Sequence, residues 1–311
     1  MRSMCSNRFG RWWEGDLPRS PAQAGPQTCA FARDARYRLR LFNGLDPCLR
    51  RGTDSWIFVT RSIAQACRTI LLTAEPRAKI MAARAAARDW RLGRLTHGFG
   101  TPMPDRPARP EHPELLPPNQ MPKRRKGGSE RGRIAMIHAL THIEFAAIDL
   151  AFDMAGRFGE QFPRGFVDDW MKVGADEAMH FALLDRRLKQ LGSHYGALPA
   201  HDGLWDAALA TRHDALARLA VVPLVLEARG LDVTPAMIER FRAVGDAATA
   251  RILERILSDE IGHVRAGITW FESGCAQANV APRPRWKYLV QRYFGGCLSR
   301  HLTTRRATQP V

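Results

Sequence analysis

Glutamate and histidine occur twice in the same arrangement in this sequence, and these residue types can bind metal. Glu144 precedes Glu177-x-x-His180 by 33 residues, and the same spacing joins a second set, Glu227 and Glu260-x-x-His263. The two sets are 83 residues apart. Because Glu and His three residues apart lie on one face of a helix, each Glu-x-x-His can direct two ligands the same way. A matched pair of sets indicates one binding site rather than a coincidence of spacing.

Four helices can bring these residues together. A single Glu from each of two helices, with Glu-x-x-His from each of two others, is the ligand set of a dinuclear carboxylate site in a four-helix bundle. We therefore predict a site for two metal ions with the ligands Glu144, Glu177, His180, Glu227, Glu260 and His263. Within it, Glu177 and Glu260 are expected to bridge the metals, and each histidine to bind one. Carboxylates with imidazoles suit iron, with manganese as the alternative.

Two aspartates repeat with the same spacing. Asp176 and Asp259 each precede a predicted histidine ligand by four residues. At that spacing an aspartate can orient the imidazole that follows it on the same helix. The alternative is that both are ordinary surface residues. His138 and His142 also precede Glu144, but His142 faces away from it on a helix. Both are therefore expected to pack in the core or to contact a ligand from outside, rather than to bind metal.

The elements that must position the site form an all-α domain over residues 130–275. We expect helices at about 130–158 and 164–191, joined by a short turn and therefore antiparallel. Residues 192–203 are long enough to cross the bundle, which predicts the single long crossover of a ferritin-like four-helix bundle. A third helix is expected from Leu204, broken at Thr234-Pro235, with Thr234 as the cap of its second half. The fourth begins near Asp246.

The flanking segments have a different character. Residues 1–58 show neither helical nor strand periodicity, so we expect an irregular segment, either a disordered arm or sequence upstream of the true start. Residues 59–98 contain an apolar stripe and an alanine-rich run, which predict two accessory helices. Residues 99–129 are rich in proline and end in the basic run Lys123–Lys126, which predicts a linker or wrapping arm. In the C-terminal segment 276–311, Trp286, Leu289 and Val290 indicate a short amphipathic helix.

Composition narrows the class of protein. The net charge is +16, yet residues 134–275 hold 14 Lys and Arg against 20 Asp and Glu. The predicted site is thus in the acidic part, and the basic flanks could meet nucleic acid, although a solvated surface is favoured because no recognition motif accompanies the charge. Six cysteines without a Cys-x-x-Cys pair fit a reducing compartment. We expect a cytoplasmic protein, with no membrane association.

Several motifs together resemble a known family. They are Ile137–Glu144, Asp176-Glu-Ala-Met-His180, Leu198–Trp205, Leu226–Pro235 and Asp259-Glu-Ile-Gly-His263. These are similar to the ferritin-like family called domain of unknown function 455, and the likeness runs from about Arg61 to Gly296. The resemblance implies a ferritin-like bundle with a dimetal centre, in bacteria, and supplies no substrate.

Three functions are compatible with these residues. The favoured hypothesis is an O₂-dependent oxidoreductase or hydroxylase with two iron ions and an unknown small-molecule substrate. A second is a protein that binds or oxidises iron without an organic substrate. A third is a scaffold that the metal stabilises, with a basic arm that binds RNA. The oligomeric state does not follow from the sequence.

Overall fold

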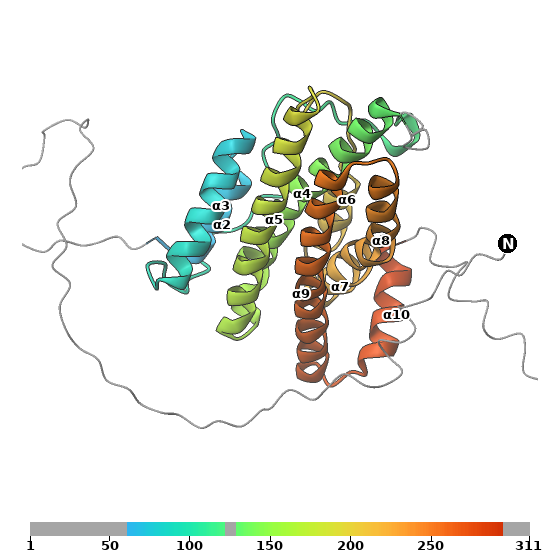
Figure 1. Cartoon of the computed structure of the whole chain (residues 1–311). Helices are drawn as coiled ribbons and strands as arrows, with labels where there is room; N and C mark the ends of the chain where they lie inside the picture. The colour runs from blue at the N-terminus through green and yellow to red at the C-terminus, as the bar shows by residue number, and fades with distance from the viewer. Residues whose placement is uncertain (1–60, 122–128, 295–311) are drawn as a thin grey trace, which may run out of the picture. The chain divides into compact units, whose positions relative to one another are not determined.

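The computed structural model describes residues 61–121 and 129–294, and within these the chain forms helices and no β-strand. Figure 1 shows them as a set of long helices with shorter ones around it. The all-α prediction is confirmed. The predictions for residues 1–58, for Lys123–Lys126 and for the end after Gly296 lie outside the described residues.

The first two long helices form a hairpin. Helix α4 spans Glu130–Phe158, and the Ser129 side chain accepts a hydrogen bond from the Gly132 amide at its start. A short turn with the 3₁₀ helix η2 (Gly159–Gln161) leads to α5 (Arg164–Gln190). Gly192, at φ +70, follows the end of α5 in the left-handed conformation that glycine tolerates best. These limits agree with the predicted 130–158 and 164–191.

The predicted break in the third helix is wrong. After α6 (Gly203–Ala210) and a turn, the chain is helical without interruption through α7 (Ala215–Val221), the π-helix η3 (Val222–Glu227) and α8 (Ala228–Ala243). Pro235 lies inside α8 at an exposed position, so the helix continues through it. The irregularity is instead the π-helix that ends on Glu227. The third helix therefore starts at Ala215, rather than near Leu204.

The remaining long helix is α9 (Ala247–Gln277). The Asp246 side chain caps it by accepting a hydrogen bond from the Thr249 amide at 2.9 Å. Helix α9 packs against α5, η3 and α8, and these elements lie side by side in Figure 1. The predicted C-terminal helix is present as α10 (Pro282–Tyr293), which packs on α7 and α9.

The N-terminal helices and the proline-rich segment cover the α4–α5 hairpin. Helix α2 (Ile63–Leu71) packs on α4, and α3 (Pro76–Arg91) packs on α5. The described part of the proline-rich segment is a wrapping arm: Trp205 donates a hydrogen bond to the Asp105 carbonyl at 2.9 Å, and the Leu116 amide donates to the Ala200 carbonyl at 2.8 Å. The arm thus holds the connection between α5 and α6 as well as α6 itself.

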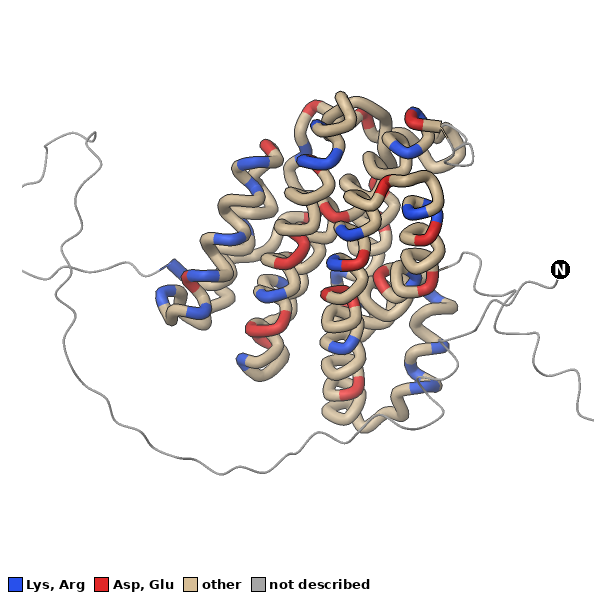
Figure 2. The backbone as a smooth tube through the Cα atoms, viewed as in Figure 1, with Lys and Arg blue, Asp and Glu red and all other residues tan. Residues whose placement is uncertain are grey.

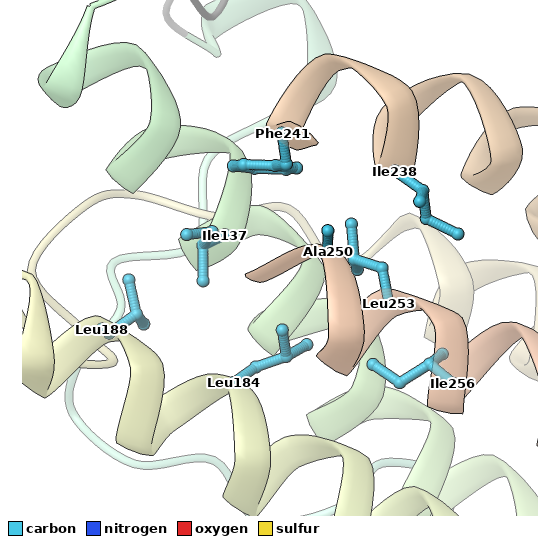
Figure 3. Close-up of a cluster of buried hydrophobic side chains, with 8 residues drawn as sticks. All are labelled: Ile137, Leu184, Leu188, Ile238, Phe241, Ala250, Leu253 and Ile256. Carbon is cyan, nitrogen blue, oxygen red and sulfur yellow. The ribbon is translucent and has the colours of Figure 1, made fainter. Parts of the chain in front are cut away.

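An apolar cluster fills the space where α4, α5, α8 and α9 meet (Figure 3). It consists of Ile137, Leu184, Leu188, Ile238, Phe241, Ala250, Leu253 and Ile256. Among the described residues, α4 with η2 is long and apolar enough to cross a membrane by length and composition, but 67% of that apolar window is buried inside the protein. Helix α4 is therefore a core helix, and its burial inside the protein explains its apolar composition.

Candidate metal centre

Helices α4, α5 and α9 and the π-helix η3 each contribute to one polar cluster inside the apolar core. Glu144 lies midway along α4, Glu177 and His180 lie on α5, Glu227 ends η3, and Glu260 and His263 lie on α9. Leu184 and Ile256 are one helical turn from His180 and Glu260, so the apolar cluster lies directly beside the polar one. Ligand atoms of Glu144, Glu177, His180 and Glu260 all lie within 4.8 Å of one another.

Around His180, three carboxylates approach the same ring nitrogen. His180 Nδ1 lies 3.3 Å from Glu177 Oε2, 3.4 Å from Glu144 Oε2 and 4.0 Å from Glu260 Oε1. His180 is fully buried. Burial opposes its charge, but the Glu144 and Glu177 carboxylates outweigh this and raise the pKa of His180 to about 11. The imidazole therefore lies in a strongly negative environment that would attract any cation.

His263 repeats this arrangement on the other side of the cluster. Its Nδ1 lies 3.0 Å from Glu177 Oε1 and 3.5 Å from Glu260 Oε2. Burial is again outweighed, chiefly by Glu177, so the pKa of His263 is far above its usual value. Glu177 and Glu260 thus each direct one oxygen toward each imidazole, and the two rings have centroids 5.8 Å apart.

The Glu227 carboxyl completes the cluster on the His263 side. It interacts electrostatically with Glu260, Glu177 and His263, and burial followed by repulsion from Glu260 and Glu177 raises its pKa to about 8. Burial and repulsion from Glu177 also raise the pKa values of Glu144 and Glu260. Glu177 is the exception, since His263 and His180 overcome the effect of burial and lower its pKa. Four of the six predicted residues therefore have mutually close ligand atoms, His263 pairs with two of them, and Glu227 is linked to the others by electrostatic interaction.

Four side-chain atoms of this cluster are buried and have no hydrogen-bond partner: Glu177 Oε1, Glu227 Oε2, Glu260 Oε2 and His263 Nδ1. Such atoms are rare, because each costs about 1–3 kcal/mol when it is left unsatisfied. The 3.0 Å approach of His263 Nδ1 to Glu177 Oε1 is short enough for a hydrogen bond but does not have the geometry of one. A bound cation would replace these ion pairs and take a lone pair from each of the four atoms, so these residues fit a metal ion.

The two predicted aspartates contact the histidines, but in a crossed arrangement. Asp259 Oδ2 on α9 lies 3.2 Å from His180 Nε2 on α5, and Asp176 Oδ2 on α5 lies 3.3 Å from His263 Nε2 on α9. The prediction that each aspartate orients the histidine of its own helix is therefore wrong. Because an ionised carboxylate only accepts, each Nε2 donates its hydrogen outward, and Nδ1 faces the glutamates. Two neighbouring helices thus orient each other's imidazoles.

Two cations behind the aspartates escaped the sequence analysis. Lys172 Nζ lies 2.7 Å from Asp176 Oδ2, and Arg255 Nε lies 2.7 Å from Asp259 Oδ2. With the histidines, these cations outweigh the effect of burial and lower the pKa of both aspartates. The signal was present in the sequence, because Lys172 and Arg255 are 83 residues apart like the ligands. The repeated unit is therefore a cation, an aspartate, a glutamate and a histidine.

The two histidines that precede Glu144 are outside the cluster, as expected. His138 Nε2 accepts a hydrogen bond from the Gly196 amide at 3.0 Å, and His142 Nδ1 lies 3.0 Å from the Tyr195 hydroxyl. Burial lowers the pKa of both imidazoles to about 4. They hold the connection between α5 and α6 against α4, so their role is in packing.

Comparison with known proteins gives a family and no activity. Residues 72–308 match a family described as "Protein of unknown function (DUF455)". The chain is 48% identical over 172 residues to an uncharacterized protein of Haemophilus influenzae, an alignment that covers 53% of this chain and 59% of the relative. The chain thus spans less than two-thirds of that relative's length. No solved structure matches. Since the family match covers most of the sequence and contains the whole polar cluster, the chain belongs to the DUF455 family.

Proposed function

We propose that this protein is a ferritin-like dimetal protein, with two iron ions as the favoured occupants and manganese as the alternative. Glu177 and Glu260 would bridge the ions. Glu144 and His180 would bind one ion, and Glu227 and His263 the other. The antiparallel α4–α5 hairpin, the long connection 191–202 and the placement of one ligand set per long helix all support a bundle of this type.

The observation that carries the proposal is the set of four buried ligand atoms, contributed by both copies of the repeat, that make no hydrogen bond; three of them approach one another at 3.0 and 3.5 Å as ion pairs. A cluster that served only stability would satisfy these atoms with hydrogen bonds of good geometry. Four carboxylates also carry about as much negative charge as two divalent cations carry positive charge, which leaves a site near neutral. Oxygen and imidazole ligands without thiolate favour iron or manganese over copper(I) or structural zinc.

We further propose that the protein is an O₂-dependent oxidoreductase acting on a small molecule. Iron bound by such ligands supplies reactivity toward O₂. The chain's own residues prepare the site: the apolar cluster beside His180 and Glu260 excludes water from that end, and the two aspartates fix the imidazole rings. The π-helix that ends on Glu227 supports a functional role, because such segments occur mostly at functional sites.

Metal analysis of the purified chain tests the site. We expect about two iron or manganese ions per chain. Glu177→Gln, at a bridge, should lose most of both ions, and Glu227→Gln should lose most of one. Glu239→Gln, which removes an exposed carboxylate of α8, should keep both. A wild-type chain without stoichiometric metal after reconstitution with iron or manganese, or a Glu177→Gln variant that keeps both ions, would contradict a dimetal site.

Oxygen consumption by the reduced, iron-loaded protein tests the reaction. An oxidoreductase should consume O₂ repeatedly when a reductant and a substrate are supplied, and the Glu177→Gln variant should not. Uptake of many more than two irons per chain, with O₂ consumed in proportion to the iron added, would instead indicate iron storage or oxidation. Metal retention with no O₂ consumption would indicate a scaffold.

A further inference from the structure

The outward face of α3 carries arginine and apolar side chains only. Its exposed large residues are Arg77, Met81, Arg84, Arg88, Arg91 and, just past the helix end, Leu92. At 3.6 residues per turn these six positions fall within an arc of about 100°. We call this set the arginine face. Figure 2 shows Lys and Arg repeatedly along α3.

The opposite face of α3 accounts for the packing of the helix. Lys79, Ala83, Ala86 and Trp90 are buried, and Trp90 donates a hydrogen bond to Asp168 of α5 at 2.7 Å. The attachment of α3 to the rest of the protein is thus complete without the arginine face. The packing of α3 on the rest of the protein therefore does not explain the arginine and apolar side chains of the outward face.

The arginine face has almost no internal compensation for its charge. Arg88 lies 3.7 Å from Asp89, which also pairs with Arg94. Within the described residues, the side chains of Arg77, Arg84 and Arg91 make no ion pair or hydrogen bond. A helix surface that only faces water usually mixes both signs of charge, since pairs at i,i+4 stabilise it. Three arginines without an ion pair, and a fourth that shares its acidic partner Asp89 with Arg94, indicate an anionic binding partner.

Apolar exposure is concentrated at the same place. The most exposed large apolar side chains among the described residues are Met81 at 61%, Leu92 at 53% and Leu72 at 49%. The first two belong to the arginine face, and Leu72 lies four residues before α3. Nucleic acid would account for the arginines but gives no reason for exposed Met and Leu among them. An anionic lipid surface accounts for both, because arginines reach phosphates while apolar side chains enter the boundary of the acyl chains.

We propose that the arginine face of α3 binds an anionic membrane surface, so that the protein associates peripherally with lipid through a helix that lies along the surface. This differs from the expectation drawn from the sequence, which searched for spanning segments. It is independent of the metal centre, whose residues lie on α4, α5, η3 and α9. The ligand class is phospholipid with a net negative headgroup, such as phosphatidylglycerol.

Sedimentation of the full chain with vesicles tests the proposal. We expect binding to vesicles of phosphatidylcholine mixed with phosphatidylglycerol, weaker binding as salt is raised, and little binding to phosphatidylcholine alone. Arg84→Gln with Arg91→Gln should weaken binding at least about tenfold, because each basic residue at such a surface contributes about 1 kcal/mol. Arg240→Gln with Arg251→Gln removes the same charge from exposed positions on α8 and α9 and should change binding far less.

The apolar side chains separate lipid from nucleic acid. Met81→Gln keeps all charges and should weaken vesicle binding several-fold, whereas Val233→Gln at an exposed position of α8 should not. A fluorescent single-stranded RNA serves as the competing probe. If the α3 arginine variants bind vesicles as wild type does, or if RNA is bound more tightly than vesicles and Met81→Gln has no effect on either, the proposal is wrong. Circular dichroism of each variant checks that the helices remain folded.

Discussion

Each histidine of the candidate centre is oriented by an aspartate from the other helix of the pair. Lys172 and Arg255 lie behind these aspartates, so each chain of contacts runs from an exposed cation through a carboxylate to a buried imidazole. The ring tautomer follows from this chain, because a carboxylate accepts the Nε2 hydrogen. The two halves share the cation, the aspartate and the histidine, but Glu144 lies 3.4 Å from His180 Nδ1, whereas Glu227 interacts with His263 electrostatically.

Asp176→Ala and Asp259→Ala should each weaken metal binding about 10- to 100-fold, because an imidazole without its outer partner loses both orientation and basicity. A competition titration against a chelator measures this. Asp185→Ala is the matched control: Asp185 is as buried as Asp176 and pairs with Lys189 on the same helix, yet contacts no histidine. Equal loss in all three variants would show that the aspartates act only through helix stability.

His138 predicts a dependence of stability on pH. Its pKa is about 4 in the folded protein because of burial and His194, against an ordinary value of about 6.5. The unfolded chain therefore binds a proton more readily, and the free energy of unfolding should fall as pH drops from about 6.5 toward 4. A loss of about 2 kcal/mol is expected. His138→Gln keeps an acceptor for the Gly196 amide and should remove this part of the pH dependence in chelator-treated protein.

At the scale of elements, the third helix shows where sequence reasoning reached its limit. Glu227 interacts electrostatically with Glu260, which agrees with the requirement, drawn from the repeat alone, that the two lie level. The predicted way of placing Glu227 was wrong. Thr234-Pro235 suggested a break in the third helix, whereas the helix changes its register through the π-helix Val222–Glu227. No amino-acid pattern in the sequence marks a π-helix. The Pro223 ring beside this one approaches Gly267 of α9 closely, and such a contact between distant residues cannot be read from local sequence.

Gly174 sets how closely α4 and α5 approach beside the centre. A Cβ atom there would lie 2.6 Å from the Phe152 ring, so Gly174→Ala should push the helices apart and lower the free energy of unfolding by about 1–3 kcal/mol. Thermal unfolding and metal content should both report the change, since Glu177 is one turn away. Adding Phe152→Leu to Gly174→Ala should partly restore the free energy of unfolding. Gly230→Ala in α8, with nothing within 4 Å, should be neutral or slightly stabilising.

For the whole molecule, the sequence predicted the all-α class and the approach of Glu144, Glu177, His180 and Glu260, because both rest on periodicity and spacing. The sequence did not predict which segments are linked by buried ion pairs. Lys79 of α3 and Arg109 of the arm both pair with Asp149 of α4, and Arg218 of α7 pairs with Asp153 of the same helix. Lys79, Asp149 and Asp153 are fully buried. These pairings join residues far apart in the chain, and no local pattern marks them.

Lys79→Met should lower the free energy of unfolding by about 3 kcal/mol, since it leaves the buried Asp149 with one cation instead of two. Chemical denaturation measures the loss. Arg106→Met, which breaks exposed pairs with Asp202 and Asp206, should cost less than about 1 kcal/mol. Equal losses would mean that the Lys79–Asp149 pair contributes no more than a surface contact.

The crossed aspartates have a consequence for how the protein can be divided. If the chain were cut in the connection after α5, one fragment would carry His180 without Asp259, and the other His263 without Asp176. Glu177, which lies between both rings, would belong to the first fragment alone. Each fragment would therefore lack a complete set of ligands for even one ion and should bind metal weakly. Metal capture would reappear only when the two pieces are mixed, which makes ion binding a reporter of their reassembly.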